Sequence, residues 1–329
     1  MRTLRVLDRD AVARCLPRAV CFALAARAFK ETSSRRADQP NRLIVPIQNT
    51  HGNVLSVMAG VLQEPLLFGA KVSAVFPENR HRQLAGHQGI VVVFDPATGT
   101  PVGVLHGGEV TARRTAAATA VATVTLARPD SNVVALIGTG EQASHHLAAL
   151  LDCLRIREVR IWSQSASRAR SFAEAHKEVP AELIVHDSVE KAVSGADVIC
   201  TLTSAPHPIL FGRQLREGQH VNAVGSSVRQ FRELDEEAIR RTRLYSDYLP
   251  MLEAEGGDYL AALRSGAITT KHVIGELGEV LLGRKPGRQS EQDITLFKSL
   301  GIIAEDLISA EHALTEAAAN DDGAVITFQ

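Results

Sequence analysis

The sequence is poor in cysteine, and this shortage excludes two classes of protein. Only four cysteines occur in 329 residues, and none forms a Cys-x-x-Cys pair. A disulfide-stabilised secreted domain or a cysteine-ligated zinc site would need more cysteines at closer spacing. We therefore expect reduced structural thiols at Cys15, Cys21, Cys153 and Cys200.

The sequence also lacks an excess of charge of either sign. Lysine and arginine number 36, aspartate and glutamate number 37, and the formal net charge is -1. Proteins whose main partner is nucleic acid or an anionic membrane usually carry a basic excess. The balance therefore favours a small molecule as the partner.

Long apolar runs are missing as well. No run approaches the roughly 20 residues that cross a bilayer, and the first residues, MRTLRVLDRDAVARCL, lack the apolar core of a signal peptide. The twelve histidines show no His-x-His or His-x-x-x-His spacing, so we expect no metal site. The sequence predicts a soluble, cytoplasmic protein without a membrane span.

The pattern of apolar and turn-forming residues changes near residue 115. Before it, short apolar runs alternate with turn residues at 41–48, 54–62, 68–76 and 89–94, and DPATGTP at 95–101 has the composition of a hairpin connection. These runs predict a mostly antiparallel sheet. The chain is long enough for two domains, so we expect this sheet to belong to a first, α+β domain.

After residue 115 strands alternate with helices. The alanine-rich segment 111–127 predicts a long helix that joins the two regions. The alternation that follows predicts right-handed crossovers and a parallel sheet with helices on both faces, which is the doubly wound (Rossmann) α/β class. A helical tail at 300–318 is expected to return to the first domain.

A glycine-rich turn follows the apolar strand 133–137. Gly138, Gly140 and Ala143 form Gly-x-Gly-x-x-Ala at the start of a helix, where backbone amides can approach a pyrophosphate. The alternative is a glycine turn that only packs a strand on a helix. In the cofactor interpretation the neighbouring Thr139, Glu141 and Gln142 also belong to the dinucleotide site.

The end of the second strand of this domain indicates which dinucleotide is bound. A carboxylate there would bind the ribose of NAD, but the sequence places Ser163 at that point, followed by Ser165 and Arg168. Hydroxyls and a guanidinium suit a 2′-phosphate, so NADPH is favoured over NADH. Arg168 could equally be a solvated helix charge, which keeps NADH open.

Four separated blocks carry a resemblance to a known family. GGEVTARRTAAATAVAT, VALIGTGEQA, HVNAVGSSVRQFREL and TLFKSLGIIAEDL occur in this order. Together they resemble the ornithine cyclodeaminase/mu-crystallin family over nearly the whole chain. The resemblance implies a substrate-binding and dimerisation domain at 1–115, completed by 306–329, a Rossmann domain at 116–305, and a homodimer.

The resemblance also implies a site for a small amino or imino acid whose carboxylate is held by Arg42, Lys71 and Arg114. Burying cations without an anion is costly, which agrees with a waiting carboxylate site. Lys71 could instead point outward and Arg42 could lie on the surface. Arg113 and Arg114 are about 100° apart on a helix, so only one of them can face the site, and the resemblance selects Arg114.

Further positions match family residues that contact the cofactor or substrate. Leu300 matches a substrate contact. Arg114 also matches a cofactor contact. The other positions that match cofactor contacts are Thr115, Thr203, Val224, Gly225, Ser226, Ser227 and Ser299.

One position departs from the cyclodeaminases of the family. Ser227 stands where those enzymes have an aspartate, and a hydroxyl cannot act as that carboxylate base. The run with Ser227, Arg232, Glu233 and Leu234 is instead similar to the ketimine reductase branch. That likeness implies NAD(P)H-dependent reduction of 1-pyrroline-2-carboxylate or 1-piperideine-2-carboxylate to L-proline or L-pipecolate. Ser227 would then bond the imine nitrogen, or merely cap a turn.

Other chemistries stay open on the same residues. They are an amino acid dehydrogenase, an opine-like imine reductase, an ornithine or lysine cyclodeaminase, and a non-catalytic NADPH-binding protein. Hydride transfer to an iminium asks the protein mainly for positioning, so histidines are not required. His87 and His207 are weak candidates for the site, whereas His145 and His146 are expected to pack or to face solvent.

Overall fold

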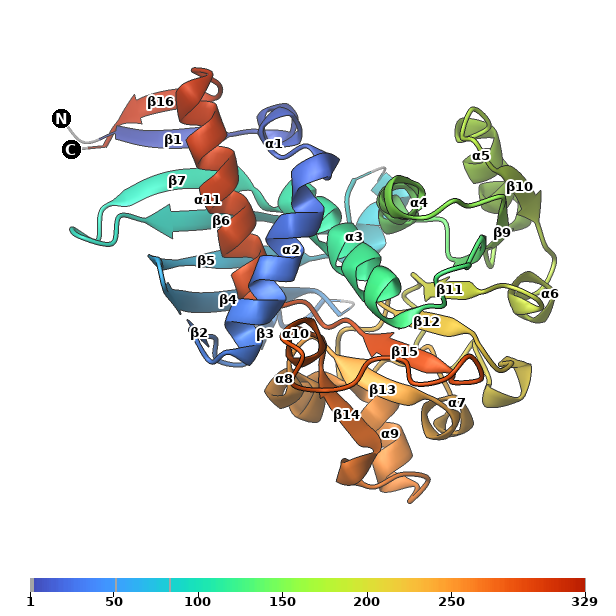
Figure 1. Cartoon of the computed structure of the whole chain (residues 1–329). Coiled ribbons are helices and arrows are strands. Elements are labelled where there is room, and N and C mark those ends of the chain that lie inside the picture. The colour runs from blue at the N-terminus through green and yellow to red at the C-terminus, as the bar shows by residue number, and fades with distance from the viewer. Residues whose placement is uncertain (1–2, 51, 83, 329) are drawn as a thin grey trace. The chain divides into compact units, whose positions relative to one another are not determined.

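The computed structural model describes residues 3–50, 52–82 and 84–328, and it divides into two compact units (Figure 1). The first unit is Met1–Arg114 with Ile302–Gln329, and the second is Thr115–Gly301. The second boundary lies four residues before the predicted one. The reason is packing, because a Cβ added at Gly60 would lie 2.4 Å from Ile303 Cγ2, so the returning chain is already seated on the first unit at this point.

The first unit is built on an eight-stranded sheet. Its strand order is β16-β1-β7-β6-β5-β4-β2, with β3 paired to β4, and only β1 and β7 run parallel. The antiparallel part agrees with the sequence analysis. The strands are β1 (Thr3–Leu7), β2 (Ala37–Asp38), β3 (Leu43–Pro46), β4 (Val54–Gln63), β5 (Leu66–Val75), β6 (His87–Phe94), β7 (Pro101–His106) and β16 (Ala324–Thr327).

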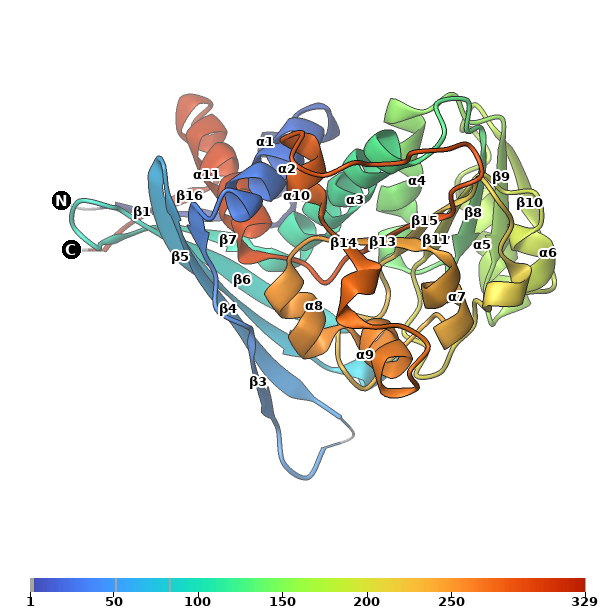
Figure 2. The same cartoon turned by 60° about the horizontal axis from the view of Figure 1, so that its bottom comes forward.

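Helix α11 (Ile303–Ala319) covers one face of this sheet (Figure 2). It packs on β4, β5 and β6, and α1 (Arg9–Cys15) and α2 (Arg18–Ser33) pack against it in turn. Close approach depends on glycine, since a Cβ at Gly69 would lie 2.9 Å from Leu307 Cδ2. Lys71 is two residues further along β5 and is buried on this same face, so it does not point outward.

The opposite face of the sheet carries apolar side chains that no helix covers within the described residues of this unit. Cross-strand register places Leu55 beside Ala74, and Val72 beside Ile90. The rings of Phe68 and Phe94 stack there with centroids 5.7 Å apart.

The second unit contains an eight-stranded sheet in which every neighbouring pair is parallel. Its order is β10-β9-β8-β11-β12-β15-β13-β14, so the direction of winding reverses at β8, as in a doubly wound fold. The predicted α/β class is confirmed. The strands are β8 (Val133–Ile137), β9 (Glu158–Trp162), β10 (Glu182–Val185), β11 (Val198–Thr201), β12 (His220–Ala223), β13 (Arg243–Ser246), β14 (Val273–Glu276) and β15 (Thr295–Lys298).

Strand β8 explains why this sheet needs continuous apolar runs. Val133 and Ile137 contribute to one hydrophobic core, whereas Val134 and Leu136 contribute to another. A strand buried on both faces reads as an unbroken apolar segment. The helices are α3 (Gly107–Leu126), which contains the boundary between the units, α4 (Glu141–Cys153), α5 (Ala166–Ala175), α6 (Val189–Val193), α7 (Glu236–Arg241), α8 (Leu249–Glu255), α9 (Gly257–Arg264) and α10 (Leu277–Leu281).

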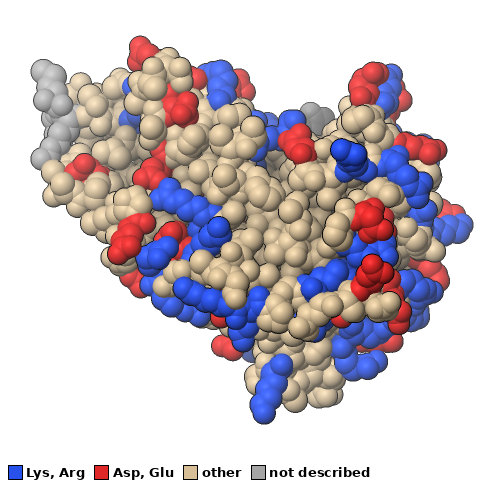
Figure 3. All heavy atoms as spheres, in the orientation of Figure 1, with Lys and Arg blue, Asp and Glu red and all other residues tan. Residues whose placement is uncertain are grey.

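Two surface properties bear on the possible partners. Within the described residues, no helix combines the length and apolar character needed to cross a bilayer. On the face drawn in Figure 3, acidic and basic side chains are interspersed.

Candidate functional site

The glycine turn of the second unit is built for close approach of an anion. Gly138 has a φ of +117°, and a Cβ there would lie 2.7 Å from the Leu202 carbonyl oxygen, so other residues are excluded. Gly140 precedes α4, and a Cβ there would meet nothing within 4 Å. In the described part of the chain no side chain caps α4. The Ala143 amide donates to the Gly140 carbonyl at 2.9 Å, and the start of α4 is the end of a helix that favours a bound pyrophosphate.

The other predicted residues of the turn differ in exposure. Ala143 is buried in the core beneath the turn, Thr139 is half-buried and Glu141 is exposed. Gln142 Oε1 is buried with no hydrogen-bond partner among the described residues. An unpaired buried acceptor is costly, so this oxygen suits a donor from a bound molecule.

The end of β9 lies beside the glycine turn, because the Gly138 amide donates to the Trp162 carbonyl at 2.8 Å. Ser163 follows directly and is half-buried. Ser165 Oγ accepts from the Arg168 amide at 3.4 Å and so caps α5. The side chain of Arg168 is exposed on the first turn of that helix.

A buried carboxylate holds the loops that follow β11 and β12. Glu233 Oε1 accepts from the amide and from the hydroxyl of Thr203, each at 2.7 Å. Its Oε2 accepts from Thr201 Oγ1 at 2.7 Å and from the Gly225 amide at 2.9 Å. Burial raises the pKa of Glu233, and the nearby Lys298 and the hydrogen bonds from Thr203 and Thr201 work in the opposite direction.

A buried ion pair adjoins Glu233. Lys298 Nζ donates to the Ser226 carbonyl at 2.5 Å and lies 2.6 Å from Asp258 Oδ2, with both side chains about 1% exposed. Asp258 Oδ1 accepts from the amides of Glu233 and Leu234 at 2.8 and 2.9 Å. The sequence analysis did not predict this network, although Glu233 lies in the run with Ser227 that is similar to the ketimine reductases.

Ser227 and the residues around it lie on the loop after β12, which Glu233 and Lys298 hold. Ser227 is half-buried, Val224 and Ser226 are buried, and Ser226 Oγ donates to the Phe231 carbonyl. The side chain of Leu300 packs in the core of the second unit, and its predicted contact with substrate stays a prediction.

The remaining predicted contacts of the second unit are also buried. The Ser299 amide donates to the Ala223 carbonyl at 3.1 Å, which ties Ser299 to the end of β12. The Leu300 amide donates to Asp247 Oδ2 at 2.6 Å. Thr115 begins the second unit within α3, and 7% of it is exposed.

The first unit brings Lys71 and Arg114 together around two carboxylates. Lys71 Nζ donates to Asp306 at 2.8 and 2.9 Å, and to Thr111 Oγ1 at 3.3 Å. Arg114 donates to Glu305 at 2.5 Å and to Asp306 at 3.2 Å. The expectation that these cations lack a protein anion was wrong, because the helix that returns to the sheet supplies two.

Arg42 belongs to the same electrostatic environment. Burial lowers the pKa of Lys71 to about 8, Asp306 opposes this shift, and Arg114 and Arg42 add to it. Lys71 thus lies within electrostatic reach of two further cations as well as of Asp306. Arg113 points elsewhere, donating to Glu109 and to the Leu16 carbonyl.

The histidines contribute little to either cluster. His146 is buried between Thr119 Oγ1 at 2.9 Å and the Gln142 carbonyl at 2.8 Å, and burial lowers its pKa to about 4. It is therefore neutral and links α3 to α4. His145 is half-buried, and His87 and His207 are exposed. No cluster of three metal-ligating side chains occurs in the described ranges.

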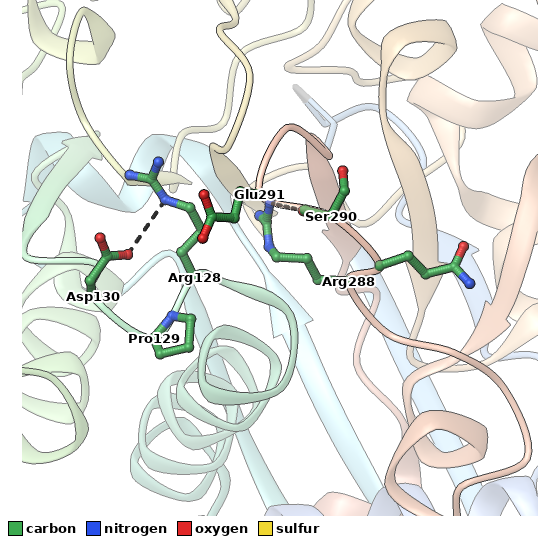
Figure 4. Close-up of a pocket in the computed structure, with 7 residues that line it drawn as sticks. Arg128, Pro129, Asp130, Arg288, Ser290 and Glu291 are labelled. Atoms are coloured by element: carbon green, nitrogen blue, oxygen red, sulfur yellow. Dashed lines mark hydrogen bonds and ion pairs between the residues drawn. The ribbon is translucent and has the colours of Figure 1, made fainter.

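A polar pocket at the amino ends of β8 and β15 is not an anion site, although Arg128 and Arg288 line it (Figure 4). Arg128 pairs with Asp197 at 2.6 Å and with Asp130 at 3.6 Å. All five N–H groups of Arg288 have protein acceptors, so it stabilises the fold. These acceptors are the carbonyls of Leu126, Gln219, Ser290 and Asp293 and the hydroxyl of Thr295.

Comparison with known proteins gives concordant results. Ketimine reductase mu-crystallin of Mus musculus is 38% identical over 273 residues, which are 83% of this chain and 83% of that protein. Delta(1)-pyrroline-2-carboxylate reductase of Bacillus cereus is 34% identical over 308 residues, 92% of this chain and 94% of that protein.

A solved structure and a family model extend the match over nearly the whole chain. The structure of Thermococcus litoralis Delta(1)-pyrroline-2-carboxylate reductase in complex with NADH and L-proline matches with a TM-score of 0.94 and 32% identity, covering 98% of this chain and 99% of that one. The family model matches residues 6–321. The chain belongs to the ornithine cyclodeaminase/mu-crystallin family.

Proposed function

We propose that this protein reduces a cyclic ketimine acid with NAD(P)H, converting 1-pyrroline-2-carboxylate or 1-piperideine-2-carboxylate to L-proline or L-pipecolate. The observation that carries the proposal is the cluster in which the buried Lys71 and Arg114 lie with Glu305 and Asp306, with the half-buried Arg42 in the same electrostatic environment. A carboxylate is a ligand that such cations bind well. The names of the relatives, which are reductases of this substrate class, support the same conclusion.

The residues of the second unit fit a dinucleotide. The amino end of α4, which no described side chain caps, and the positive φ of Gly138 fit the pyrophosphate of such a cofactor, and the buried Gln142 oxygen can accept from one of its ribose hydroxyls. When bound, the reduced nicotinamide supplies a hydride to the imine carbon.

The chain's own residues then have limited tasks. The cations hold the carboxylate, and this fixes the imine carbon and excludes unproductive orientations. Reduction also adds one proton at nitrogen. Lys71, with a pKa of about 8, holds a proton at neutral pH that it can release and regain. The hydroxyl of Ser227 is a neutral hydrogen-bonding group for that nitrogen.

An assay that follows oxidation of NADPH and NADH tests the reaction. We expect turnover with the two cyclic imines, and none with L-ornithine by ammonia release. Arg114→Met should lower kcat/KM by about 10- to 100-fold, because a charged hydrogen bond contributes roughly 1.5–3 kcal/mol. Arg113→Met is the matched control, since Arg113 bonds to Glu109. Robust turnover of pyruvate with ammonia, and none of the imines, would replace this proposal with an amino acid dehydrogenase.

The preference for NADPH is a finer proposal that rests on Arg168 and Ser163. Arg168 is exposed in the first turn of α5, the helix that follows β9. Arg168→Ala should weaken NADPH binding about tenfold and leave NADH binding unchanged, because a 2′-phosphate loses a charge-assisted partner. Arg170→Ala is the control on the same helix. Equal affinities for both dinucleotides in the wild type would show that these residues do not select the cofactor.

The homodimer is likewise proposed, with the uncovered face of the first unit's sheet as its interface. Exposed apolar faces of this kind mark protein interfaces. The partner that covers this face is a second copy of the chain. Its apolar side chains continue across neighbouring strands, as they do in the buried part of a symmetric interface. Its residues are Leu43 and Val45 of β3, Leu55, Val57, Ala59 and Val61 of β4, Phe68, Ala70, Val72 and Ala74 of β5, Ile90, Val92 and Phe94 of β6, and Val104 of β7.

A further inference from the structure

Glu233 connects two loops that leave neighbouring strands of the second unit. Thr201 ends β11 and Thr203 follows it, whereas Gly225 lies two residues beyond the end of β12. The four hydrogen bonds that Glu233 accepts come from these three residues, and two of the donors are backbone amides. One carboxylate therefore fixes the backbone of both loops at the carboxyl edge of the sheet.

Glu233 is itself held rigidly. Its own amide and that of Leu234 donate to Asp258, whose other oxygen meets Lys298. Space around the carboxylate is also fully used, because a Cβ added at Gly225 would lie 2.1 Å from the Thr203 carbonyl and 2.5 Å from Glu233 Oε1. The loop that contains Glu233 is thus held by Asp258 at its backbone and by the tightly packed backbone of Gly225 and Thr203 at its carboxylate.

In a doubly wound sheet, ligands bind outside the carboxyl ends of the strands. The turn at Gly138 and the end of β9 at Ser163 belong to one half of the sheet, and β11 and β12 belong to the other half, beyond β8. A dinucleotide that lays its pyrophosphate on the α4 amides directs its adenosine toward β9 and its nicotinamide toward β11 and β12. We propose that Glu233 is a positioning residue, which holds the loops 201–203 and 224–227 in place for the nicotinamide half of the cofactor.

This inference rests on the proposed function only in taking NAD(P)H as the ligand. It makes a specific demand on the chemistry of residue 233. Each carboxylate oxygen accepts from one backbone amide, of Thr203 or of Gly225, and amides cannot reverse their role. A glutamine has the same shape, but its NH₂ group must face one of these N–H groups, which leaves two donors opposed.

The test compares binding of the whole cofactor with binding of its adenine half. In the Glu233→Gln variant we expect the Kd of NADPH or NADH to rise about tenfold or more, since an opposed buried donor is costly. Binding of ADP-ribose and of its 2′-phosphate should stay within about twofold of wild type, because these fragments reach only the Gly138 and Ser163 side. Both are measured by calorimetry on the full chain.

Glu236→Gln is the matched control, because Glu236 lies three residues away and pairs at the surface with Arg232. It should leave every affinity unchanged. Should Glu233→Gln fail to fold, Glu233→Asp keeps both acceptor oxygens and retracts them by one methylene. It should show the same selective loss to a smaller degree.

Two results would overturn the proposal. A parallel loss of dinucleotide and fragment binding would mean that Glu233 only stabilises the fold, and undiminished dinucleotide binding would mean that the loops do not need it. The outcome is separable from that of the proposed reaction. A wild-type protein that binds NADPH but leaves ketimines unreduced defeats the reaction, yet the fragment comparison still decides the role of Glu233.

Discussion

Lys71 combines two properties that oppose each other, namely complete burial and a positive charge. Its pKa falls to about 8 through burial, in spite of the contact with Asp306. An ammonium with this pKa is largely protonated at pH 7 and largely neutral above pH 9. Arg42 and Arg114 remain charged throughout this range. The affinity of the site for a carboxylate should therefore depend on pH through one residue.

We predict that binding of a ring carboxylate such as pyrrole-2-carboxylate weakens as pH rises through about 8. The direction follows because deprotonation removes a cation. The inhibition constant should rise about tenfold between pH 7 and 9.5, as one charge near a carboxylate is worth on the order of 1–4 kcal/mol. Lys71→Arg should flatten the profile. An unchanged profile in that variant would assign the titration to another group.

Four of the residues that sequence analysis missed are buried acids. Glu305 and Asp306 pair with cations, and Glu233 and Asp258 hold loops, yet acidic residues are mostly exposed and give no burial signal. Their partners are also distant, with Lys71 and Asp306 separated by 235 positions. Arg42, Lys71 and Arg114 were identified through the family resemblance, and the place of Lys71 inside an apolar run agreed with it. The predicted contact of Leu300 with substrate stays a prediction, because an apolar residue beside a site does not reveal which way it points.

At the level of elements, the contact between β5 and α11 decides whether the first unit is well packed. Gly69 lies at this contact, where a Cβ would be 2.1 Å from the Val92 carbonyl as well as close to Leu307. The backbone oxygen of a paired strand cannot move away cheaply. Any side chain at Gly69 therefore separates β5 from β6 or displaces the helix.

Gly69→Ala should accordingly lower the free energy of unfolding by about 2 kcal/mol or more, which is typical of overpacking. Thermal and urea unfolding measure the loss. Gly86→Ala is the control within the same unit, because its Cβ would be 3.6 Å from the nearest atom, an ordinary contact. Equal stability of the two variants would contradict the packing at β5.

The elements differed in how far the sequence predicted them. The antiparallel strands, the long helix α3 and the alternating second half follow from periodicity and from the glycine turn. The first 38 residues were not assigned, because β1 pairs with β7 and β16 from distant parts of the chain. Helix α2 packs largely on α11, which comes from the far end. Local patterns cannot reveal partners that the chain supplies later.

For the whole molecule, the uncovered sheet face predicts association of two copies. The chain has a mass of 35.4 kDa, and light scattering should give twice this value. Leu55→Glu combined with Ile90→Glu should shift the protein to the monomer, because two carboxylates would have to be desolvated at the interface.

Phe22→Glu serves as the matched control for the interface. Phe22 is 36% exposed, but it lies on α2, on the helical side of the first unit. A dimer that survives the double substitution would place the interface elsewhere, and a monomeric wild type would remove it.

The first unit is discontinuous, and this shapes how the protein is made. A ribosome adds about 5–20 residues per second, so residues 1–114 wait while all of the second unit is synthesised. During that interval the nascent sheet has no α11 above it and no β16 beside β1, and Asp306 and Glu305 are not yet there to pair with Lys71 and Arg114. The second unit, continuous in sequence, can fold as it emerges, whereas the earliest part of the chain is completed last and exposes unpaired strand edges, which favour aggregation, until then.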